Sequence, residues 1–518
     1  MRVAVIGAGF AGVVTTKVLL QFGHKPVLFE KAPDVGGVWS ATRRYPGLST
    51  QNNKDTYCLS DQPWPKSIPE WPSGDQVQNY VEIYANRFGV ADVARLSTEV
   101  TSVTEHDGGW QVTSDGPHGT ATEQFDAVVV ANGIFSRPKI PVYPGAEEFV
   151  AAGGRVCAPS DIHDLAEVAG KDVLVVGYGK SGCDIAVTVC DAAASTTMVA
   201  RQLIWKMPKK LMGKLNFKYL MMNRMGEGLF EYQRPTPFEK VLHGPAKPVR
   251  DAAMNGLAKV ATFQHKLDTM GLVPEGPFEN IGRSTVSLTT DGFFEGAQEG
   301  KIRVVRDTVI ARLEVRDGRR VAVLSTGDEV ACDMVIAATG WHQDVPFLSP
   351  DVMDRLTDER GNYQLYRQIL PHDVPGLYFC GYNSSFFSPL SAEVAALWIV
   401  EHLDGRLSLP PEEERRAHVA ERLRWMEWRT DNHHARGTNV IPFSMHGIDD
   451  ALSDLGIRVG PIQRGLEWAL PIVPGRYRWV TDELLARRAD EQWLSGRSAK
   501  RAEAMATAQR RSGADEIG

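Results

Sequence analysis

The sequence has few cysteines, and no two of them form a C-x-x-C pair. Among its 518 residues the six cysteines are scattered at positions 58, 157, 183, 190, 332 and 380. A chain of this length can bury a large core without disulfide bonds, and scattered cysteines are typical of a reducing compartment. We therefore expect a cytoplasmic protein that is held together by packing.

Long apolar runs and an excess of basic charge are absent as well. No uncharged run reaches the roughly 18–20 apolar residues of a membrane-spanning helix, so we expect no integral membrane segment. Residues 1–14 imitate a signal peptide, but they lack a small-residue cleavage site and contain patterned glycines. Lys and Arg number 57 against 64 Asp and Glu, and the resulting net charge of −7 does not suit a nucleic-acid-binding protein.

The histidines show no spacing that is typical of a metal site. His433 and His434 are adjacent, whereas two ligands on one face of a helix stand at positions i and i+4. The G-x-S-x-G turn of many hydrolases is also missing. We therefore expect no bound metal and no serine hydrolase chemistry.

Glycine is in excess, with 48 residues or about 9% of the chain against an average of about 7%. Gly7, Gly9 and Gly12 form a G-x-G-x-x-G turn between an apolar strand predicted at Arg2–Ile6 and a predicted helix. The first glycine allows the tight turn, the second lets the backbone approach a pyrophosphate, and the third lets the helix pack closely. Glu30 ends the next predicted strand, where a carboxylate can accept hydrogen bonds from ribose. This pattern predicts a dinucleotide-binding unit.

The same pattern recurs in the middle of the chain. Gly177, Gly179 and Gly182 follow a second apolar strand, and Lys180 lies inside the turn. Arg201 occupies the strand end that corresponds to Glu30. A cation at the ribose position suits a 2′-phosphate, so this unit favours NADPH over NADH. The alternative is that Arg201 is a solvated surface arginine.

Two dinucleotide units, the first with an acidic and the second with a basic strand end, predict an α/β fold that binds FAD and NADPH. A third apolar strand, at 334–338, suggests that the NADPH-binding domain is inserted into a discontinuous FAD-binding domain. The predicted FAD-binding domain has a first segment at 1–145 and a second segment at 331–410. Between them lies the NADPH-binding domain at 150–330 with a helical insertion at about 202–290, and a helical C-terminal extension follows at 411–518.

Several longer motifs accompany the two turns. They are Phe29-Glu30-Lys31, Val35-Gly36-Gly37-Val38-Trp39, Tyr45-Pro46-Gly47-Leu48, Ser60-Asp61-Gln62-Pro63-Trp64-Pro65, Ala131-Asn132-Gly133, the run from Gly179 to Ala186, and Ala337-Ala338-Thr339-Gly340-Trp341. With these motifs the chain resembles the flavin-containing monooxygenase family, a group of class B flavoprotein monooxygenases related to Baeyer–Villiger and N-hydroxylating enzymes. The resemblance extends from residue 1 to about residue 400.

The resemblance implies an enzyme in which NADPH reduces FAD and O₂ then adds to give a C4a-(hydro)peroxyflavin, which oxygenates a small organic substrate. It implies catalytic positions at Gln51 and Asn52. It also implies cofactor contacts at Gly7, Gly9, Phe10, Ala11, Gly12, Glu30, Lys31, Gly37, Val38, Trp39, Asp61, Val100, Gly177, Gly179, Lys180, Ser181, Gly182, Arg201, Thr339 and Gly340.

Two positions depart from the family pattern. If Gly154 is the glycine of the family's F-x-G-x-x-x-H stretch, its Phe and His positions hold Ala152 and Ala158. Gln51 stands where N- or S-oxygenating members have asparagine and Baeyer–Villiger members have aspartate. Glutamine keeps the amide and offers no carboxylate to pair with an arginine. This favours N- or S-oxygenation or hydroxylation over Baeyer–Villiger insertion, although a purely structural turn glutamine stays open.

Two further alternatives receive less support. An NADPH-dependent flavin reductase of the disulfide type would need a redox pair beside the flavin, and Cys183 and Cys190 lack the C-x-x-C form. A non-catalytic flavoprotein is the other alternative. The sequence permits a homodimer without indicating one.

The insertion begins with an unusual stretch. Residues 201–224 contain seven basic residues and no acidic one, interleaved with apolar side chains. One interpretation is an amphipathic lid that gates a lipophilic substrate or touches a membrane surface. The other is a core-packed helix pair with solvated lysines.

Overall fold

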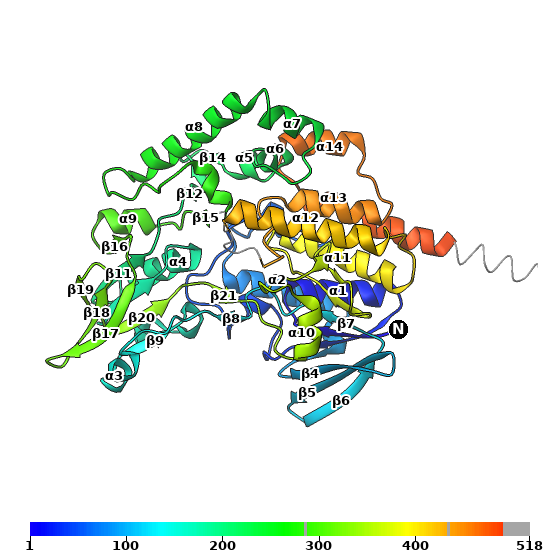
Figure 1. Cartoon of the computed structure of the whole chain (residues 1–518), viewed down its shortest axis with the longest axis horizontal. Coiled ribbons are helices and arrows are strands. Elements are labelled where there is room, and N and C mark those ends of the chain that lie inside the picture. Colours follow the sequence, from blue (N-terminus) through cyan, green and yellow to red (C-terminus); the bar gives the residue numbers. More distant parts are fainter. Residues whose placement is uncertain (284–286, 432–435, 491–518) are drawn as a thin grey trace, which may run out of the picture.

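Two five-stranded parallel sheets form the framework of the molecule (Figure 1). The computed structural model describes residues 1–283, 287–431 and 436–490, so His433, His434 and the end of the expected C-terminal extension lie outside the described residues. The first sheet has the order β24-β7-β1-β2-β3, with bounds Leu377–Phe379, Ala127–Val130, Arg2–Ile6, Lys25–Phe29 and Ala94–Arg95. The second has the order β16-β11-β10-β20-β9, with bounds Arg303–Arg306, Ser195–Ala200, Asp172–Val176, Met334–Ala337 and Arg155–Cys157.

The central strands are apolar on both faces because helices cover one face of each sheet and a three-stranded antiparallel sheet packs against the other. All four residues of β7 and of β20 are buried, and β1 is buried from Val3 to Ile6. Helix α1 (Phe10–Gln21) follows β1, and helix α11 (Ser388–Leu403) packs against it. Helix α4 (Lys180–Val189) follows β10 in the same way. The α/β fold with two dinucleotide-binding sheets is therefore confirmed.

One predicted strand lies in the other sheet. We expected the strand near 334–338 to open the second segment of the FAD-binding domain, but β20 pairs in parallel with β10, from Val173 opposite Met334 onward. The first sheet resumes only at β24, which pairs with β7. A short apolar strand that ends in Thr-Gly suits either sheet, because its sequence does not encode its neighbour. We therefore place residues 331–340 with the second sheet.

The two chain segments that cross between the sheets pair with each other. Strand β8 (Arg137–Pro138) lies in the segment that leaves the first sheet, and it pairs antiparallel with β21 (Trp341–His342) on the return path. Three-stranded antiparallel sheets flank the two parallel ones. They are formed by β4 (Glu99–His106), β5 (Gly109–Gly116) and β6 (Gly119–Phe125), and by β17 (Ile310–Arg316), β18 (Arg319–Leu324) and β19 (Glu329–Ala331).

Helices of the insertion lie along the upper side of the molecule, and those of the C-terminal extension run from there down to α11 (Figure 1). The insertion supplies α5 (Lys218–Met221), α6 (Arg224–Gly228), α7 (Pro237–His243) and α8 (Lys247–His265). The extension supplies α12 (Glu412–Thr430), α13 (Ser444–Asp454), α14 (Pro461–Ala469) and a further helix from 479 to the last described residue, 490. Across the described ranges, no helix has the length and apolar character needed to cross a membrane.

A single cluster of buried apolar side chains joins these regions. It includes Val5 of the first sheet, Val175 of the second, Trp205 of the insertion, Trp398 of α11 and Phe443 of the extension. Because one core is shared, the two sheets hold their sites in a fixed relation.

Candidate functional site

A cavity of about 1970 Å³ lies between the two sheets, and both glycine turns open into it. Its walls come from the first turn, from the loop at 45–52, from the crossover segments and from the second turn. A cleft of this size, placed at the carboxyl ends of parallel strands, is where such folds bind ligands.

The first turn has the geometry of a phosphate cradle. Gly7 has φ +106°, and a Cβ on Gly12 would lie 1.7 Å from the carbonyl oxygen of Gly7, so both positions require glycine. Helix α1 begins at Gly9 without a side-chain cap and without an acidic residue in its first turn. Gly9, Phe10 and Ala11 line the cavity. The uncapped N–H groups of this helix end can therefore bind a pyrophosphate.

Glu30 is held beside this turn by two backbone groups. Its Oε2 accepts from the N–H of Ala8 at 2.7 Å, and its Oε1 accepts from the N–H of Ala32 at 2.8 Å. The carboxylate lines the cavity at the end of β2, as expected for a ribose contact. The cavity wall nearby includes the other residues predicted for this site: Lys31, Gly37, Val38, Trp39 and Val100.

The second turn repeats the cradle. Gly177 has φ +111°, and a Cβ on Gly182 would lie 2.1 Å from the carbonyl oxygen of Gly177. Helix α4 begins at Gly179 without a side-chain cap, and a Cβ there would meet nothing within 4 Å. Gly179 and Ser181 line the cavity, so this helix end is also open to a phosphate.

Arg201 and Lys180, the two basic residues of the second unit, differ in whether an acidic side chain already binds them. Arg201 is exposed at the end of β11 and lines the cavity, and within the described ranges it forms no hydrogen bond or ion pair. The ammonium of Lys180 also lines the cavity, but it pairs with Asp184 one turn along α4. Burial lowers the pKa of Lys180, and Asp184 opposes this effect. Arg201 is thus the cation of this pair that remains available to a 2′-phosphate.

The loop at 45–52 joins the two halves of the cavity. The hydroxyl of Tyr45 donates to Asp184 of α4 at 3.1 Å, and the hydroxyl of Thr290 donates to the same carboxylate at 2.5 Å. Burial, and then the charge of Asp184, raise the pKa of Tyr45 well above its ordinary value, so the phenol stays protonated. A Cβ on Gly47 would lie 2.3 Å from the hydroxyl oxygen of Thr188, which shows how closely the loop approaches α4.

The two predicted catalytic residues end this loop. The Oε1 of Gln51 accepts from the backbone N–H of Leu288 at 3.2 Å. The Nδ2 of Asn52 donates to the carbonyl oxygen of Phe386, just before α11. Both residues line the cavity. Gln51 therefore connects the first unit to the insertion, while Asn52 connects it to the return segment.

Three predicted cofactor residues lie outside the cavity wall. Gly12 and Gly182 lie behind their turns, where they serve helix packing as expected. The carboxylate of Asp61 lies 2.9 Å from the ammonium of Lys17, which is almost fully buried on α1. Asp61 therefore neutralises the buried Lys17 of α1.

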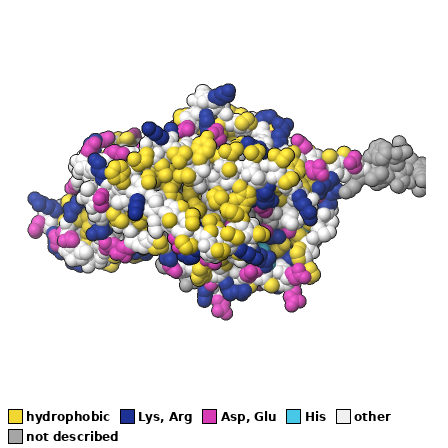
Figure 2. Space-filling model, turned by 90° about the horizontal axis from the view of Figure 1, so that it is seen from above, with side chains coloured by type: hydrophobic (Ala, Val, Ile, Leu, Met, Phe, Trp, Pro, Cys, Tyr) yellow, Lys and Arg dark blue, Asp and Glu magenta, His cyan; other side chains and the backbone are white. Residues whose placement is uncertain are grey.

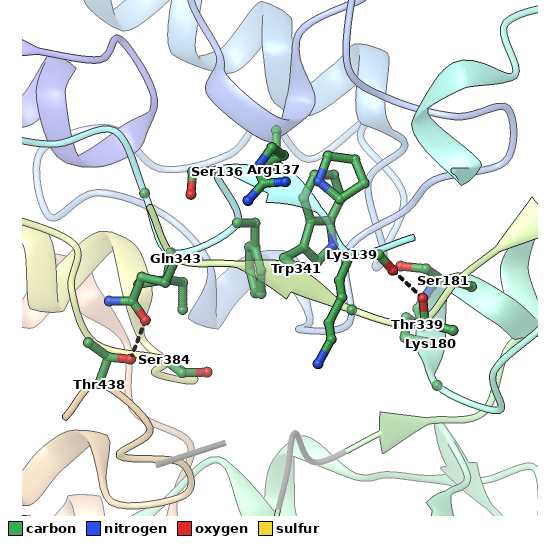
Figure 3. Close-up of a pocket in the computed structure, with 18 of the residues that line it drawn as sticks. Ser136, Arg137, Lys139, Lys180, Ser181, Thr339, Trp341, Gln343, Ser384 and Thr438 are labelled. Atoms are coloured by element: carbon green, nitrogen blue, oxygen red, sulfur yellow. Dashed lines mark hydrogen bonds between the residues drawn. The ribbon is translucent and has the colours of Figure 1, made fainter. Parts of the chain in front are cut away.

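The crossover segments supply cavity residues to which sequence reasoning gave no role (Figure 3). Thr339 and Gly340 line the wall as predicted, and the hydroxyl of Thr339 donates to the carbonyl oxygen of Lys139. The side chain of Lys139 extends into the open space (Figure 3). On the other side, the hydroxyl of Thr438 donates to Oε1 of Gln343 at 2.9 Å. Only the Ala337–Trp341 motif signalled this region in advance.

The basic stretch at 201–224 is largely neutralised by contacts inside the molecule. Lys209 pairs with Asp291, Lys210 with Glu70, and Lys218 with Asp55. Lys206 is buried and donates to the carbonyl oxygen of Tyr178 at 2.8 Å. The interpretation as solvated lysines was therefore wrong for Lys206, Lys209 and Lys218, which attach the insertion to the rest of the molecule, whereas Lys210 is exposed.

The described residues give no support for a metal site or for a redox-active cysteine pair. Within the described ranges no group of three or more His, Cys, Asp and Glu side chains could hold a metal ion. All six cysteines are free, and burial raises the pKa of Cys183. Cys183 and Cys190 both belong to or end α4, away from the turn that would hold the flavin.

Two uncapped dinucleotide turns that face one cavity define a protein with two dinucleotide sites, of which the first suits FAD and the second suits a nicotinamide dinucleotide. Residues 1–247 match the sequence profile of the family described as flavin-binding monooxygenase-like. Flavin-containing monooxygenase 1 of Sus scrofa is 27% identical over 434 residues, which cover 79% of this chain and 75% of that protein. The chain is therefore similar to flavin-containing monooxygenases over most of its length, and its two dinucleotide sites suit FAD and NADPH.

Solved structures share the fold. S-allyl-L-cysteine S-oxygenase from Allium sativum superposes with a TM-score of 0.60 at 20% identity, covering 95% of this chain and 98% of that one. Cyclohexanone monooxygenase in its closed form superposes with a TM-score of 0.66 at 18% identity, covering 88% of this chain and 98% of that one. At these identities the likeness concerns the arrangement of the sheets.

Proposed function

We propose that this chain uses NADPH and O₂ to transfer one oxygen atom to a small organic substrate, by N- or S-oxygenation or by hydroxylation. The observation that carries the proposal is the single cavity into which both helix ends and Gln51 open. The reaction consumes the substrate, O₂, NADPH and a proton, and it yields the oxygenated substrate, water and NADP⁺. When bound, FAD supplies the chemistry that accepts a hydride from NADPH and activates O₂.

The chain's own residues bind and orient the two cofactors. The N-terminus of α1 would hold the pyrophosphate of FAD, and Glu30 would accept from its ribose. The N-terminus of α4 and the hydroxyl of Ser181 would hold the phosphates of NADPH, and Arg201 its 2′-phosphate. Asp184 ties the loop of the first unit to α4 of the second through its bond to Tyr45.

Gln51 contributes a hydrogen-bond donor to the cavity. Its Oε1 is occupied by the N–H of Leu288, which assigns the orientation of the amide. Its Nε2 then remains free to donate toward a group bound in the cavity. An aspartate at this position would accept only and would bring a negative charge. This supports oxygenation at nitrogen or sulfur over Baeyer–Villiger insertion into a ketone or aldehyde.

The decisive experiment identifies the product. The purified enzyme, loaded with FAD, is supplied with NADPH and ¹⁸O₂ and offered panels of amines, sulfides and ketones, and the products are analysed by mass spectrometry. We expect one ¹⁸O atom in an N-oxide, hydroxylamine, sulfoxide or alcohol. An ester that carries ¹⁸O would instead establish the Baeyer–Villiger alternative. NADPH oxidation that yields only hydrogen peroxide with all panels would contradict the proposal.

A further inference from the structure

One lysine of the basic stretch at 201–224 is buried. The upper side of the molecule, where the helices of the insertion lie, shows mainly hydrophobic side chains, with Lys and Arg toward its margins (Figure 2). Lys206 is not exposed at any surface, because only 3% of the residue is accessible. It lies on β12 (Lys206–Met207), which pairs in parallel with β15 (Ser287–Leu288). A buried ammonium costs free energy unless its surroundings compensate the charge, so its partners indicate its role.

The ammonium of Lys206 binds the second glycine turn from behind. Its Nζ donates to the carbonyl oxygen of Tyr178, the middle residue of the Gly-Tyr-Gly turn, at 2.8 Å. It also lies 3.2 Å from the hydroxyl oxygen of Ser287 and 4.7 Å from the centre of the Tyr178 ring. A carbonyl, a hydroxyl and the face of a ring are neutral groups, and they compensate a buried cation only in part.

The positive charge of Lys206 has no counter-ion within the part of the chain that the structure describes. No Asp or Glu of those residues forms an ion pair with it, whereas Lys209 and Lys218 each have one. The neighbouring thiol of Cys183 cannot supply a negative charge, because burial raises its pKa more than Lys206 lowers it. A buried cation without a carboxylate partner is compensated when an anion binds beside it.

The peptide between Tyr178 and Gly179 connects this charge to the phosphate site. The C=O and N–H of a trans peptide point in opposite directions, so the bond from Lys206 to the carbonyl directs the N–H of Gly179 away from the ammonium. That N–H has no acceptor among the described residues, and a Cβ on Gly179 would meet nothing within 4 Å. Because Gly179 lines the cavity, the N–H is directed to the side where the helix end can bind a phosphate.

The first turn offers an internal comparison. Its corresponding carbonyl, that of Ala8, accepts from the backbone N–H of Gly36 at 2.8 Å. A neutral amide therefore holds the peptide of the first turn, while an ammonium holds that of the second. The two turns share one backbone geometry, so the packing of such a turn does not require the charge. The charge of Lys206 is then left to act on the ligand.

We propose that Lys206 is a positioning residue for the pyrophosphate of the dinucleotide at the second turn: it orients the Tyr178–Gly179 peptide, and the pyrophosphate is its counter-ion. This inference rests on the proposed function, because it takes NADPH as the ligand of this turn. Lys206 acts on the part of the ligand that NADPH and NADH share, whereas Arg201 acts on the 2′-phosphate that only NADPH carries. Lys206 therefore contributes affinity, and Arg201 contributes selectivity.

The test is calorimetric titration of the full-length, FAD-loaded enzyme with NADP⁺, NAD⁺ and two fragments. The fragment 2′,5′-ADP carries a 5′-phosphate and a 2′-phosphate, whereas 2′-AMP carries only the latter. Lys206→Met should weaken the binding of NADP⁺, NAD⁺ and 2′,5′-ADP roughly tenfold each and leave that of 2′-AMP unchanged, because the lost charge acts on the 5′-phosphate. Arg201→Gln should instead weaken the binding of NADP⁺ and of both fragments and leave that of NAD⁺ nearly unchanged.

Lys218→Met is the matched control. It also removes an ammonium that attaches the insertion, 2.7 Å from Asp55, but it does so away from the second turn. It should bind all four ligands like the unchanged enzyme. Flavin content and the unfolding temperature without nucleotide report whether each variant is folded. Lys206→Gln is a second neutral variant that keeps a hydrogen-bond donor, and it should show the same losses as Lys206→Met.

Equal losses for 2′-AMP and 2′,5′-ADP in the Lys206 variants would overturn the proposal, because they would show a general disturbance of the second unit. Unchanged affinities in both Lys206 variants, in an enzyme that binds NADP⁺, would overturn it as well and leave the proposed function intact. An unchanged enzyme that binds neither NADP⁺ nor 2′,5′-ADP would overturn the proposed function and, with it, the role of Lys206.

Discussion

The phenol oxygen of Tyr45 lies 3.1 Å from Oδ2 of Asp184, and this bond fastens a loop of the first sheet to the first helix of the second. Asp184 is almost fully buried, and Lys180 and Thr290 also bind it. The carboxylate therefore sets the separation between the two helix ends that would hold the cofactors.

Tyr45→Phe should slow the reduction of FAD by NADPH several-fold while FAD content stays unchanged. The lost hydrogen bond stabilises the fold by about 1 kcal/mol, so the main effect is on the alignment of the two sites. Anaerobic stopped-flow absorbance measures the rate. Tyr84→Phe is the control, because it removes a buried phenol that bonds Asp61 away from the cavity. Equal reduction rates in the Tyr45 variant and the unchanged enzyme would contradict this role.

Two alanine substitutions in the first turn should have different effects, one on the binding of FAD and the other on the folding of the protein. Gly9 has φ −77°, and a Cβ there would lie 3.7 Å from the nearest atom, on Gly37, so Gly9→Ala should fold and lose FAD. Gly12→Ala should fail to fold, since its Cβ would overlap the carbonyl of Gly7. Flavin absorbance per protein and thermal unfolding measure the two effects. A Gly9→Ala protein with full FAD content would show that the turn does not cradle the cofactor.

Arg201→Gln should raise the KM for NADPH by roughly ten- to a hundredfold, because it removes a charge-assisted bond to the 2′-phosphate. The kcat/KM for NADH should stay nearly constant. Arg303→Gln, on the neighbouring strand β16 and outside the cavity, is the matched control. If the unchanged enzyme has the same kcat/KM for NADH and NADPH, the assignment of Arg201 is wrong.

Gln51→Ala should leave the rate of FAD reduction intact and divert NADPH oxidation from product to hydrogen peroxide. The amide that donates into the cavity is lost, and the N–H of Leu288 loses its acceptor. Gln51→Glu tests the donor alone, because its carboxylate can still accept from Leu288. Ser49→Ala, in the same loop, is the control. The measurement is the ratio of oxygenated product to NADPH consumed. An unchanged ratio in both Gln51 variants would show that Gln51 has no role in the oxygenation.

His446 should make stability depend on pH. Burial lowers its pKa, but the carboxylates of Glu227 and Glu239 raise it more, from 6.5 to about 9. A raised pKa in the folded state stabilises fully below pH 6.5, and this stabilisation is lost as the pH rises through 9. We expect the free energy of unfolding to fall by about 3 kcal/mol across this window. Urea unfolding at several pH values measures the slope.

His446→Gln should flatten that slope, since an uncharged side chain binds no extra proton. His106→Gln, at an exposed position on β4, should keep it. A slope that persists in His446→Gln would assign the pH dependence to other groups.

Local patterns predicted the two glycine units well. Strand β1 begins and ends at the expected residues, and β10 precedes the second glycine turn as expected, because a short apolar run, a glycine turn and a helix constrain each other within a few residues. Glu30 and Arg201 reach the cavity wall for the same reason. Gln51 and Asn52 also reach it, although their roles remain predictions.

Long-range partners were not predictable from the same patterns. Whether β20 joins the first or the second sheet depends on the strand with which it pairs, which is β10. Whether the ammonium of Lys180 is free to bind a ligand depends on its ion pair with Asp184. Asp61 was expected at the flavin and instead neutralises Lys17. Helix α14 shows the limit most clearly, because Ile462 is 80% exposed while Glu467 is buried, and a hydrophobic period reveals two faces of a helix without saying which one is inside.

The strand order determines when each sheet can be completed during translation. The edge strand β24 of the first sheet is synthesised after the whole second sheet, although β1 of the same sheet is synthesised before it. A nascent chain that ends near residue 247 lacks β24 and also lacks β16 and β20, so both sheets have open apolar edges. The cradle for the flavin is therefore complete only late in translation, when strands from the second half of the chain have closed both sheets.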